Sequence, residues 1–175
     1  MAYGLDEFCT DLNRILKAKG LAGLPEIAEK LKTLLVNPEF VAATFEGSSA
    51  PQRVLHHDAE TDAYVMAHIQ QAGKSGVPHS HGASWAIYGN ARGDTDMTEY
   101  RRVNPETEDH AVLEAFDRYR LSPGKTRAYG PHMIHSTAHP DGAWVIRITG
   151  TDLDTVPRYY FRPKKDMVLQ PAAAE

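Results

Sequence analysis

Two histidines separated by one residue are the strongest candidates for chemistry in this sequence. His79 and His81 stand in the segment Pro78–Gly82. On a β-strand, residues i and i+2 point to the same face and lie about 6.6 Å apart. The pair can therefore hold a divalent metal if that face is concave and a third ligand comes from elsewhere. The alternative is a pair of surface histidines beside a proline turn.

A second group of histidines supplies candidates for the third ligand. Five of the nine histidines lie in two short segments, and the second segment contains His132, His135 and His139. Imidazole nitrogens suit several divalent metals, so one of these residues can complete a site. His132 and His139 could instead orient a ligand through a hydrogen bond, or replace His135 if the strand register differs.

The first 45 residues follow a helical pattern. Apolar residues recur at helical spacing across positions 5–16, and Gly20 ends the run. Pro25 suits the first turn of a second helix. Asn37 is the expected N-cap of a third, short helix that ends at Phe45.

From Arg53 onward the pattern changes to short strands separated by glycine and proline. The expected strands are Tyr64–Gln70, Ser84–Tyr88, Thr98–Val103, Ala143–Thr149 and Tyr159–Phe161. The pair His56 and His57, next to Asp58, is expected in a solvated turn. Many short strands of this kind predict a mostly β fold: a sandwich, a jelly roll or a closed barrel.

Length and composition limit the functional classes. The 175 residues suit one domain, with N-terminal helices at 1–46, a β-barrel at 47–165 and a tail at 166–175. The net charge of -4 argues against a nucleic-acid partner. Cys9 is the single cysteine, which excludes an intrachain disulfide and fits a reducing cytoplasm. No segment has the pattern of a signal peptide or a membrane helix, so we expect a soluble, cytoplasmic protein.

The spacing of glycines around the histidines resembles the two sequence motifs of the cupin superfamily. Gly73 precedes His79 and His81, and Gly93 follows them, as in the first cupin motif. The second motif is similar to the segment 124–139, with His135 at its metal-binding position. The resemblance implies a double-stranded β-helix, or jelly-roll barrel, in which these three histidines hold a metal.

This chain departs from the cupin pattern at a position that matters for the metal. The glutamate that usually follows the second histidine by five residues is Ala86 here. In the second motif, Gly130, His132 and His139 stand where the family usually has Pro, Gly and Asn. Loss of the glutamate implies three neutral ligands, which leave the full +2 charge on the metal and favour anionic, chelating substrates.

Within the cupins, the sequence most resembles the thiol dioxygenases, cysteine dioxygenase and 3-mercaptopropionate dioxygenase. Trp85 follows the H-x-H-G segment as in the bacterial enzymes, and the gap from His81 to His135 is similar. Arg53 lies 26 residues before His79, where these enzymes have an arginine that binds the substrate carboxylate. The resemblance implies that Arg53 binds an anionic group of the substrate.

The Ser-His-Tyr relay of the thiol dioxygenases is not matched. Its histidine and tyrosine positions are Arg147 and Thr149, and the tyrosine two residues before the family's arginine is Pro51. Arg147 alternates with apolar neighbours, so it can point into the barrel and bind a substrate carboxylate or phosphate. The alternatives are an internal ion pair or a place at the rim. His68, at mid-strand, could be an acid/base group, a hydrogen-bond donor or a structural histidine.

These observations lead to one functional hypothesis and two alternatives. The hypothesis is a mononuclear non-heme iron dioxygenase, similar to cysteine dioxygenase, that acts on dioxygen and a small anionic substrate other than cysteine. The metal would be Fe(II), with Zn, Ni or Mn as other possibilities. One alternative is another three-His cupin enzyme: a dioxygenase that cleaves a diketone or hydroxyketone, or a Zn or Ni lyase or isomerase. The other is a non-catalytic metal- and ligand-binding cupin. The oligomeric state is expected to be a monomer or a homodimer.

Overall fold

The computed structural model describes residues 3–162, and their N-terminal part is helical as expected. The helices are α1 (Leu5–Lys19), a 3-10 turn η1 (Gly20–Gly23), α2 (Leu24–Leu35) and α3 (Pro38–Phe45). Gly20 ends α1 with a φ of 53°, a conformation that glycine adopts without steric cost. The Asn37 side chain caps α3 by accepting hydrogen bonds from the amides of Glu39 and Phe40.

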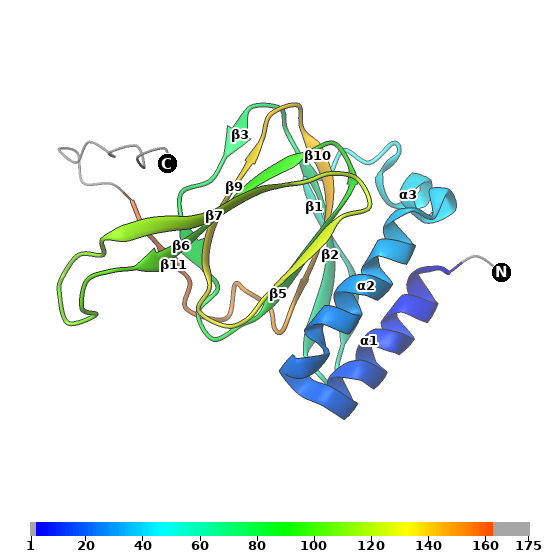
Figure 1. The fold of residues 1–175 in the computed structure, drawn as a ribbon. Coiled ribbons are helices and arrows are strands. Elements are labelled where there is room, and N and C mark those ends of the chain that lie inside the picture. Colours follow the sequence, from blue (N-terminus) through cyan, green and yellow to red (C-terminus); the bar gives the residue numbers. More distant parts are fainter. Residues whose placement is uncertain (1–2, 163–175) are drawn as a thin grey trace.

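Up to residue 162, eleven strands follow, and they form two sheets that face each other (Figure 1). They are β1 (Gln52–Asp58), β2 (Ala63–Gln70), β3 (Lys74–Ser75), β4 (His79–Ser80), β5 (Ala86–Arg92), β6 (Thr95–Arg102), β7 (Leu113–Leu121), β8 (Thr126–Tyr129), β9 (Ile134–His139), β10 (Ala143–Thr149) and β11 (Tyr159–Tyr160). The first sheet has the order β1-β2-β10-β5-β8, and the second has the order β11-β4-β9-β6-β7 with β3 beside β9.

The strand order is that of a jelly roll. Among the eight central strands, β2 pairs with β10, β4 with β9, β5 with β8 and β6 with β7, all antiparallel. The first strand thus pairs with the last, the second with the one before the last, and so on inward. These are the pairs of one long hairpin that has been wound into two facing sheets. The predicted double-stranded β-helix is therefore confirmed.

The helices cover the outer face of the first sheet (Figure 1). Residues of β2, β5 and β10 at alternating positions join α1 and α2 in the largest apolar core, with Val65, Ile87 and Ile146 on the sheet side. Helix α2 lies close to β5 at Gly89. A methyl group at that position would lie 2.5 Å from a side-chain carbon of Leu35 and 3.0 Å from one of Leu31. The glycine thus permits the close approach of the helix.

The opposite face of the first sheet points into the barrel. Because side chains alternate along a strand, Met66 and His68 of β2, Tyr88 of β5 and Arg147 of β10 all lie on this inner face. The register confirms it, since Arg147 pairs with Met66 on one side and with Tyr88 on the other. The interior therefore has polar side chains next to the histidines together with a smaller apolar cluster that includes Met97, Leu121 and Val145, whereas the helix-facing core is apolar.

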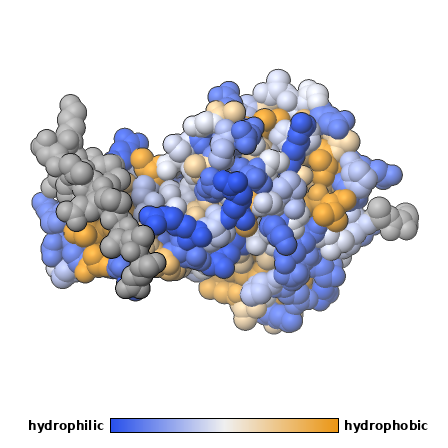
Figure 2. Space-filling model, turned by 45° about the horizontal axis from the view of Figure 1, so that its top comes forward, coloured by the Kyte–Doolittle hydropathy of each residue, from blue (hydrophilic) through white to orange (hydrophobic). Residues whose placement is uncertain are grey.

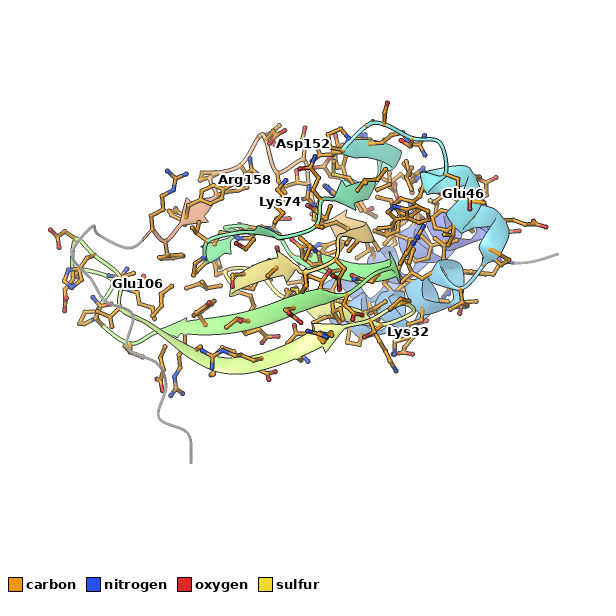
Figure 3. All side chains as sticks on the ribbon, turned by 90° about the horizontal axis from the view of Figure 1, so that it is seen from above. Lys32, Glu46, Lys74, Glu106, Asp152 and Arg158 are labelled. Carbon is orange, nitrogen blue, oxygen red and sulfur yellow. The ribbon has the colours of Figure 1, made fainter. Side chains whose placement is uncertain are left out.

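Strands β6 and β7 extend beyond the barrel as a two-stranded arm. Seen from above in Figure 3, Glu106 marks the tip of this arm, at the end of the molecule opposite to the helices with Lys32 and Glu46. Ion pairs tie the two strands together, including Arg101 to Glu114 at 2.8 Å.

Figure 2 shows hydrophilic residues over most of the visible face and hydrophobic ones in small groups.

Several expectations about individual elements need correction. His56 and His57 lie within β1 and not in a turn, and the ring of His57 stacks on that of Tyr64 in β2. The strands β1, β3, β7, β8 and β9 were not expected individually. The predicted tail at 166–175 lies outside the described residues. No helix among residues 3–162 is long and apolar enough to cross a membrane.

The packing of α2 on the sheet predicts the effect of a cavity there. Leu31 is 0% exposed at the contact with β5. We expect Leu31→Ala to lower the free energy of unfolding by about 3 kcal/mol, because it removes buried methyl groups and leaves a void. Urea denaturation measures this change. Val36→Ala is the matched control, since Val36 is 67% exposed. Equal losses in both variants would contradict the packing described here.

Candidate metal centre

Three histidines from two segments that are distant in the sequence meet inside the barrel. His79 on β4 lies opposite His135 on β9 in the strand register, and His81 follows directly after β4. One ring nitrogen of each residue lies within 4.8 Å of one ring nitrogen of each of the others. The structure thus brings together the three residues predicted from the sequence as metal ligands.

The electrostatic state of these histidines suits a metal. Burial lowers the pKa of His81 to about 2 and that of His135 to about 3, and it also lowers the pKa of His79. All three imidazoles are therefore neutral at pH 7, which is the form that binds a metal. The Nδ1 atom of His79 donates to the carbonyl oxygen of Val77 at 3.0 Å, so the lone pair of this ring is on Nε2.

The ligand set fits a divalent transition metal with open coordination positions. The group contains three imidazoles and no carboxylate among residues 3–162. The absence of a carboxylate agrees with Ala86, which is buried at the position of the usual cupin glutamate. His81 is 4% and His135 1% exposed, whereas His79 is half-buried. Three neutral imidazole donors suit Fe(II), Zn and Ni, and they suit Mn less well.

Tyr88 is a site residue that the sequence did not reveal. Its hydroxyl lies 3.3 Å from Nε2 of His81 and 3.4 Å from Nε2 of His135. Burial raises the pKa of Tyr88, and the nearby guanidinium of Arg147 partly offsets this effect. The phenol stays protonated at pH 7 and can donate a hydrogen bond at the metal. In the sequence, the one sign that Tyr88 faces the barrel interior was its alternation with Ala86 and Asn90 along β5.

Arg147 points into the barrel, as one interpretation of the sequence proposed. Its Nη2 donates to the sulfur of Met66 at 3.3 Å, and its Nε is buried without a hydrogen-bond partner. Within residues 3–162 no carboxylate pairs with this guanidinium, so the alternative of an internal ion pair is not observed. An unpaired guanidinium beside a metal site attracts anions.

A cavity of about 130 Å³ adjoins the histidines. Its walls come from both sheets and are His68, Gln70, His79, Tyr88, Asn90, Thr95, Leu121, Thr137, His139, Val145 and Arg147. His68 is buried, and its Nε2 has no hydrogen-bond partner. Burial lowers its pKa to about 3, and the charge of Arg147 adds to this shift. His68 is thus a neutral group inside the cavity.

Arg53 does not lie in this cavity. It pairs in register with Ala67 of β2, whose side chain belongs to the core on the helix side of the sheet. Its Nη2 donates to the carbonyl oxygen of Thr44 in α3 at 2.7 Å. The expectation that Arg53 binds the substrate anion is therefore corrected, because the register turns its side chain away from the metal.

The remaining candidates have other environments. His139 is buried, and its Nδ1 lies 3.1 Å from the hydroxyl of Thr95. His132 is exposed and has a positive φ of 63°. Neither residue belongs to the group of converging nitrogens. Thr149 is buried, and its hydroxyl donates to the carbonyl oxygen of Thr151 and not to one of the three histidines.

A polar network behind His135 holds its ring in place. The ring of Tyr129 stacks on that of His135 with a centroid distance of 4.7 Å and an interplanar angle of 10°. The hydroxyls of Tyr129 and Tyr119 are hydrogen-bonded, and Tyr119 donates to the buried carboxylate of Glu99 at 2.8 Å. Arg127 pairs with Glu99 at 2.8 Å and balances its charge. The network limits the motion of this ligand.

Comparison with known proteins finds similarity at the level of solved structures. No family model and no curated protein matches the sequence. KdgF from Halomonas sp. is 19% identical with a TM-score of 0.44, over 62% of this chain and 88% of that one. A cupin superfamily protein from Desulfitobacterium hafniense is 15% identical with a TM-score of 0.42, over 64% and 88%.

A third similar structure is an uncharacterized conserved protein with a double-stranded β-helix domain from Klebsiella pneumoniae. It is 13% identical with a TM-score of 0.44, over 69% of this chain and 88% of that one. All three similarities are distant. The fold of this protein is established by its own strand order, and the candidate metal centre by the convergence of His79, His81 and His135.

Proposed function

We propose that this protein is a mononuclear non-heme iron dioxygenase of the cysteine dioxygenase-like cupin group. Its substrate would be a small anion, bearing a thiol or a carboxylate, other than cysteine. One observation carries the proposal: of three converging neutral histidines without a carboxylate, His79 lines a cavity that also contains the guanidinium of Arg147, which has no carboxylate partner among residues 3–162. The positive charges of the metal and of Arg147 would then be balanced by a bound anionic ligand.

The ligand set supports this choice of substrate. His79, His81 and His135 would hold the metal as neutral donors, so its +2 charge would not be compensated by the protein. Fe(II) in such a site supplies open positions for an anionic donor and for dioxygen. The charge of Arg147 adds to that of the metal, and the combined field favours a substrate with a negative group at each point of attachment.

The other side chains of the cavity have roles that follow from their positions. Arg147 would bind the second anionic group of the substrate and orient it. The Tyr88 hydroxyl, within 3.4 Å of two ligand nitrogens, would donate a hydrogen bond to a substrate atom held there. The buried walls exclude bulk water, which strengthens both interactions. Because Arg147 and Thr149 replace the relay residues of the thiol dioxygenases, the substrate is expected to differ from cysteine.

The proposal is tested by loading the protein with Fe(II) and measuring oxygen consumption. The substrates to compare are short thiol carboxylates, cysteine and 1,3-dicarbonyl compounds. Consumption that depends on both iron and substrate, with cysteine turned over poorly, is the expected result. Absence of turnover with every compound, in protein shown by elemental analysis to contain iron, would rule out the dioxygenase.

A second candidate function uses the same residues with another metal. Three imidazoles suit zinc as well as iron, and the protonated Tyr88 phenol next to the ligands would donate a hydrogen bond to negative charge that develops on the substrate of a lyase or isomerase. Elemental analysis of protein purified without added metal separates the two. Zinc or nickel as the resident metal, together with no oxygen consumption after iron loading, would favour the second candidate.

Removal of one ligand should abolish metal binding. We expect His81→Ala to lose the metal, because two imidazoles cannot hold a divalent ion in competition with a chelator. Metal content after dialysis against a chelator measures the loss. His132→Ala is the matched control, since His132 is exposed and lies outside the cluster. A His81→Ala protein that keeps its full metal content would contradict the assignment of the site.

The pKa shifts predict how the stability of the metal-free protein depends on pH. In the fold, the pKa values of His68, His81 and His135 are about 3, 2 and 3, below their ordinary value of 6.5. The unfolded chain therefore binds more protons as the pH falls below about 6.5. The stability is complete above this pH and decreases below it, by up to roughly 1.4 kcal/mol per pH unit for each histidine.

Urea denaturation of the metal-free protein between about pH 7 and pH 5 measures this dependence. His68→Gln should make the dependence less steep by the share of one histidine. The exposed His132, replaced in the same way, should leave it unchanged. A stability that does not vary with pH over this range would show that the buried histidines are not held neutral in the fold.

A further inference from the structure

We infer that Arg147 and His68 form a subsite for a carboxylate in the cavity beside the metal centre, and that this subsite selects short acids without an amino group. The inference deepens the proposed function, because it specifies the substrate class of the same site. It depends on three features of the cavity: two buried nitrogens without a hydrogen-bond partner, the absence of an acidic residue among the described wall residues and a small volume.

The two donors belong to neighbouring strands and face the same space. His68 pairs with Val145 in the register of β2 and β10, and Arg147 lies two residues further along β10 on the same face. This is the diagonal arrangement, in which long side chains can act on one ligand. Both side chains line the cavity.

Each of these side chains has a buried nitrogen without a partner, Nε2 of His68 and Nε of Arg147. His68 is 7% exposed, so bulk water does not satisfy its nitrogen. A buried donor without an acceptor costs about 1–3 kcal/mol. A carboxylate has two oxygens, which can accept from the guanidinium and from a neutral imidazole at the same time. Carboxylate binding would therefore give a hydrogen-bond partner to both buried nitrogens.

The charge of the cavity wall determines which acids fit. Within residues 3–162, none of the residues that line the cavity is an aspartate, glutamate or lysine, and Arg147 is the single arginine among them. The ammonium group of an amino acid would have no counter-charge there, and its desolvation would be unfavourable. A simple carboxylate is accepted, and a zwitterion is not.

The volume of the cavity limits the length of the acid. An apolar cavity of about 150 Å³ in another protein holds benzene, which has six non-hydrogen atoms. The cavity here has about 130 Å³. The substrate would thus have about six non-hydrogen atoms, counted with its carboxylate. One end would lie at Arg147 and His68, and the other at the histidine ligands.

Isothermal titration calorimetry of the full-length protein, both metal-free and loaded with zinc, tests the inference without turnover. The probes are propionate, alanine and propionamide, which have similar sizes and different charges. We expect propionate to bind to both forms. Alanine and propionamide should bind at least about tenfold more weakly, a difference of about 1.4 kcal/mol.

Variants of the two donors identify the subsite. Arg147→Met and His68→Leu should each weaken propionate binding at least about tenfold, whereas Arg147→Lys should keep part of it. Arg53→Met is the matched control and should bind propionate like the wild type, because Arg53 faces α3. Circular dichroism shows whether each variant is folded, and Arg147→Lys tests the charge if Arg147→Met does not fold.

Three results would each overturn the inference. The first is the absence of propionate binding to either form of the wild type. The second is equal binding of propionate and alanine. The third is a loss of binding in Arg53→Met that does not occur in Arg147→Met. Failure of the proposed function looks different, because propionate would still bind to the metal-free protein while iron loading gave no oxygen consumption.

Discussion

The antiparallel register of β2, β10 and β5 is the constraint on which the rest of the structure depends. Side chains alternate between the two faces of these strands, so the register decides which residues meet the helices and which enter the barrel. Val65, Ile87 and Ile146 lie on the helix side. Arg147 and Tyr88 lie on the opposite side, next to the histidines. A shift by one residue would exchange the apolar core and the polar cavity.

This division explains how a polar cavity can exist in a small barrel. The helices α1 and α2 bury the apolar face of the first sheet and provide most of the hydrophobic core, so the interior of the barrel need not be filled with apolar groups. The polar side chains inside are then stabilised by partners, as Glu99 is by Arg127 and Tyr119. The side chains that keep unpaired nitrogens are those around the candidate substrate cavity.

The position of the positive charge distinguishes this site from the pattern that its sequence resembles. Arg53 donates a hydrogen bond to the backbone of α3, whereas Arg147 lines the cavity from β10. A tyrosine also reaches the histidines, but it comes from β5 and not from the strand of Arg147. The candidate ligands and their surroundings are thus positioned by different parts of the barrel, because the pairing of β4 with β9 places His79 opposite His135 and the first sheet supplies Tyr88 and Arg147.

The sequence by itself determined the helices, the β class of the rest and the three histidines. Helical periodicity, the Asn37 cap and the spacing of His79 and His81 are local signals, whereas the choice of His135 came from the resemblance to a known sequence motif, and the structure agrees with all of them. The tertiary structure alone decided that Tyr88 touches the ligands and that Arg53 does not. Both outcomes depend on which strands pair and in which register, and the pairs of a jelly roll join residues that are far apart in the chain. Local patterns carry no information about such contacts, and only the folded barrel brings them together.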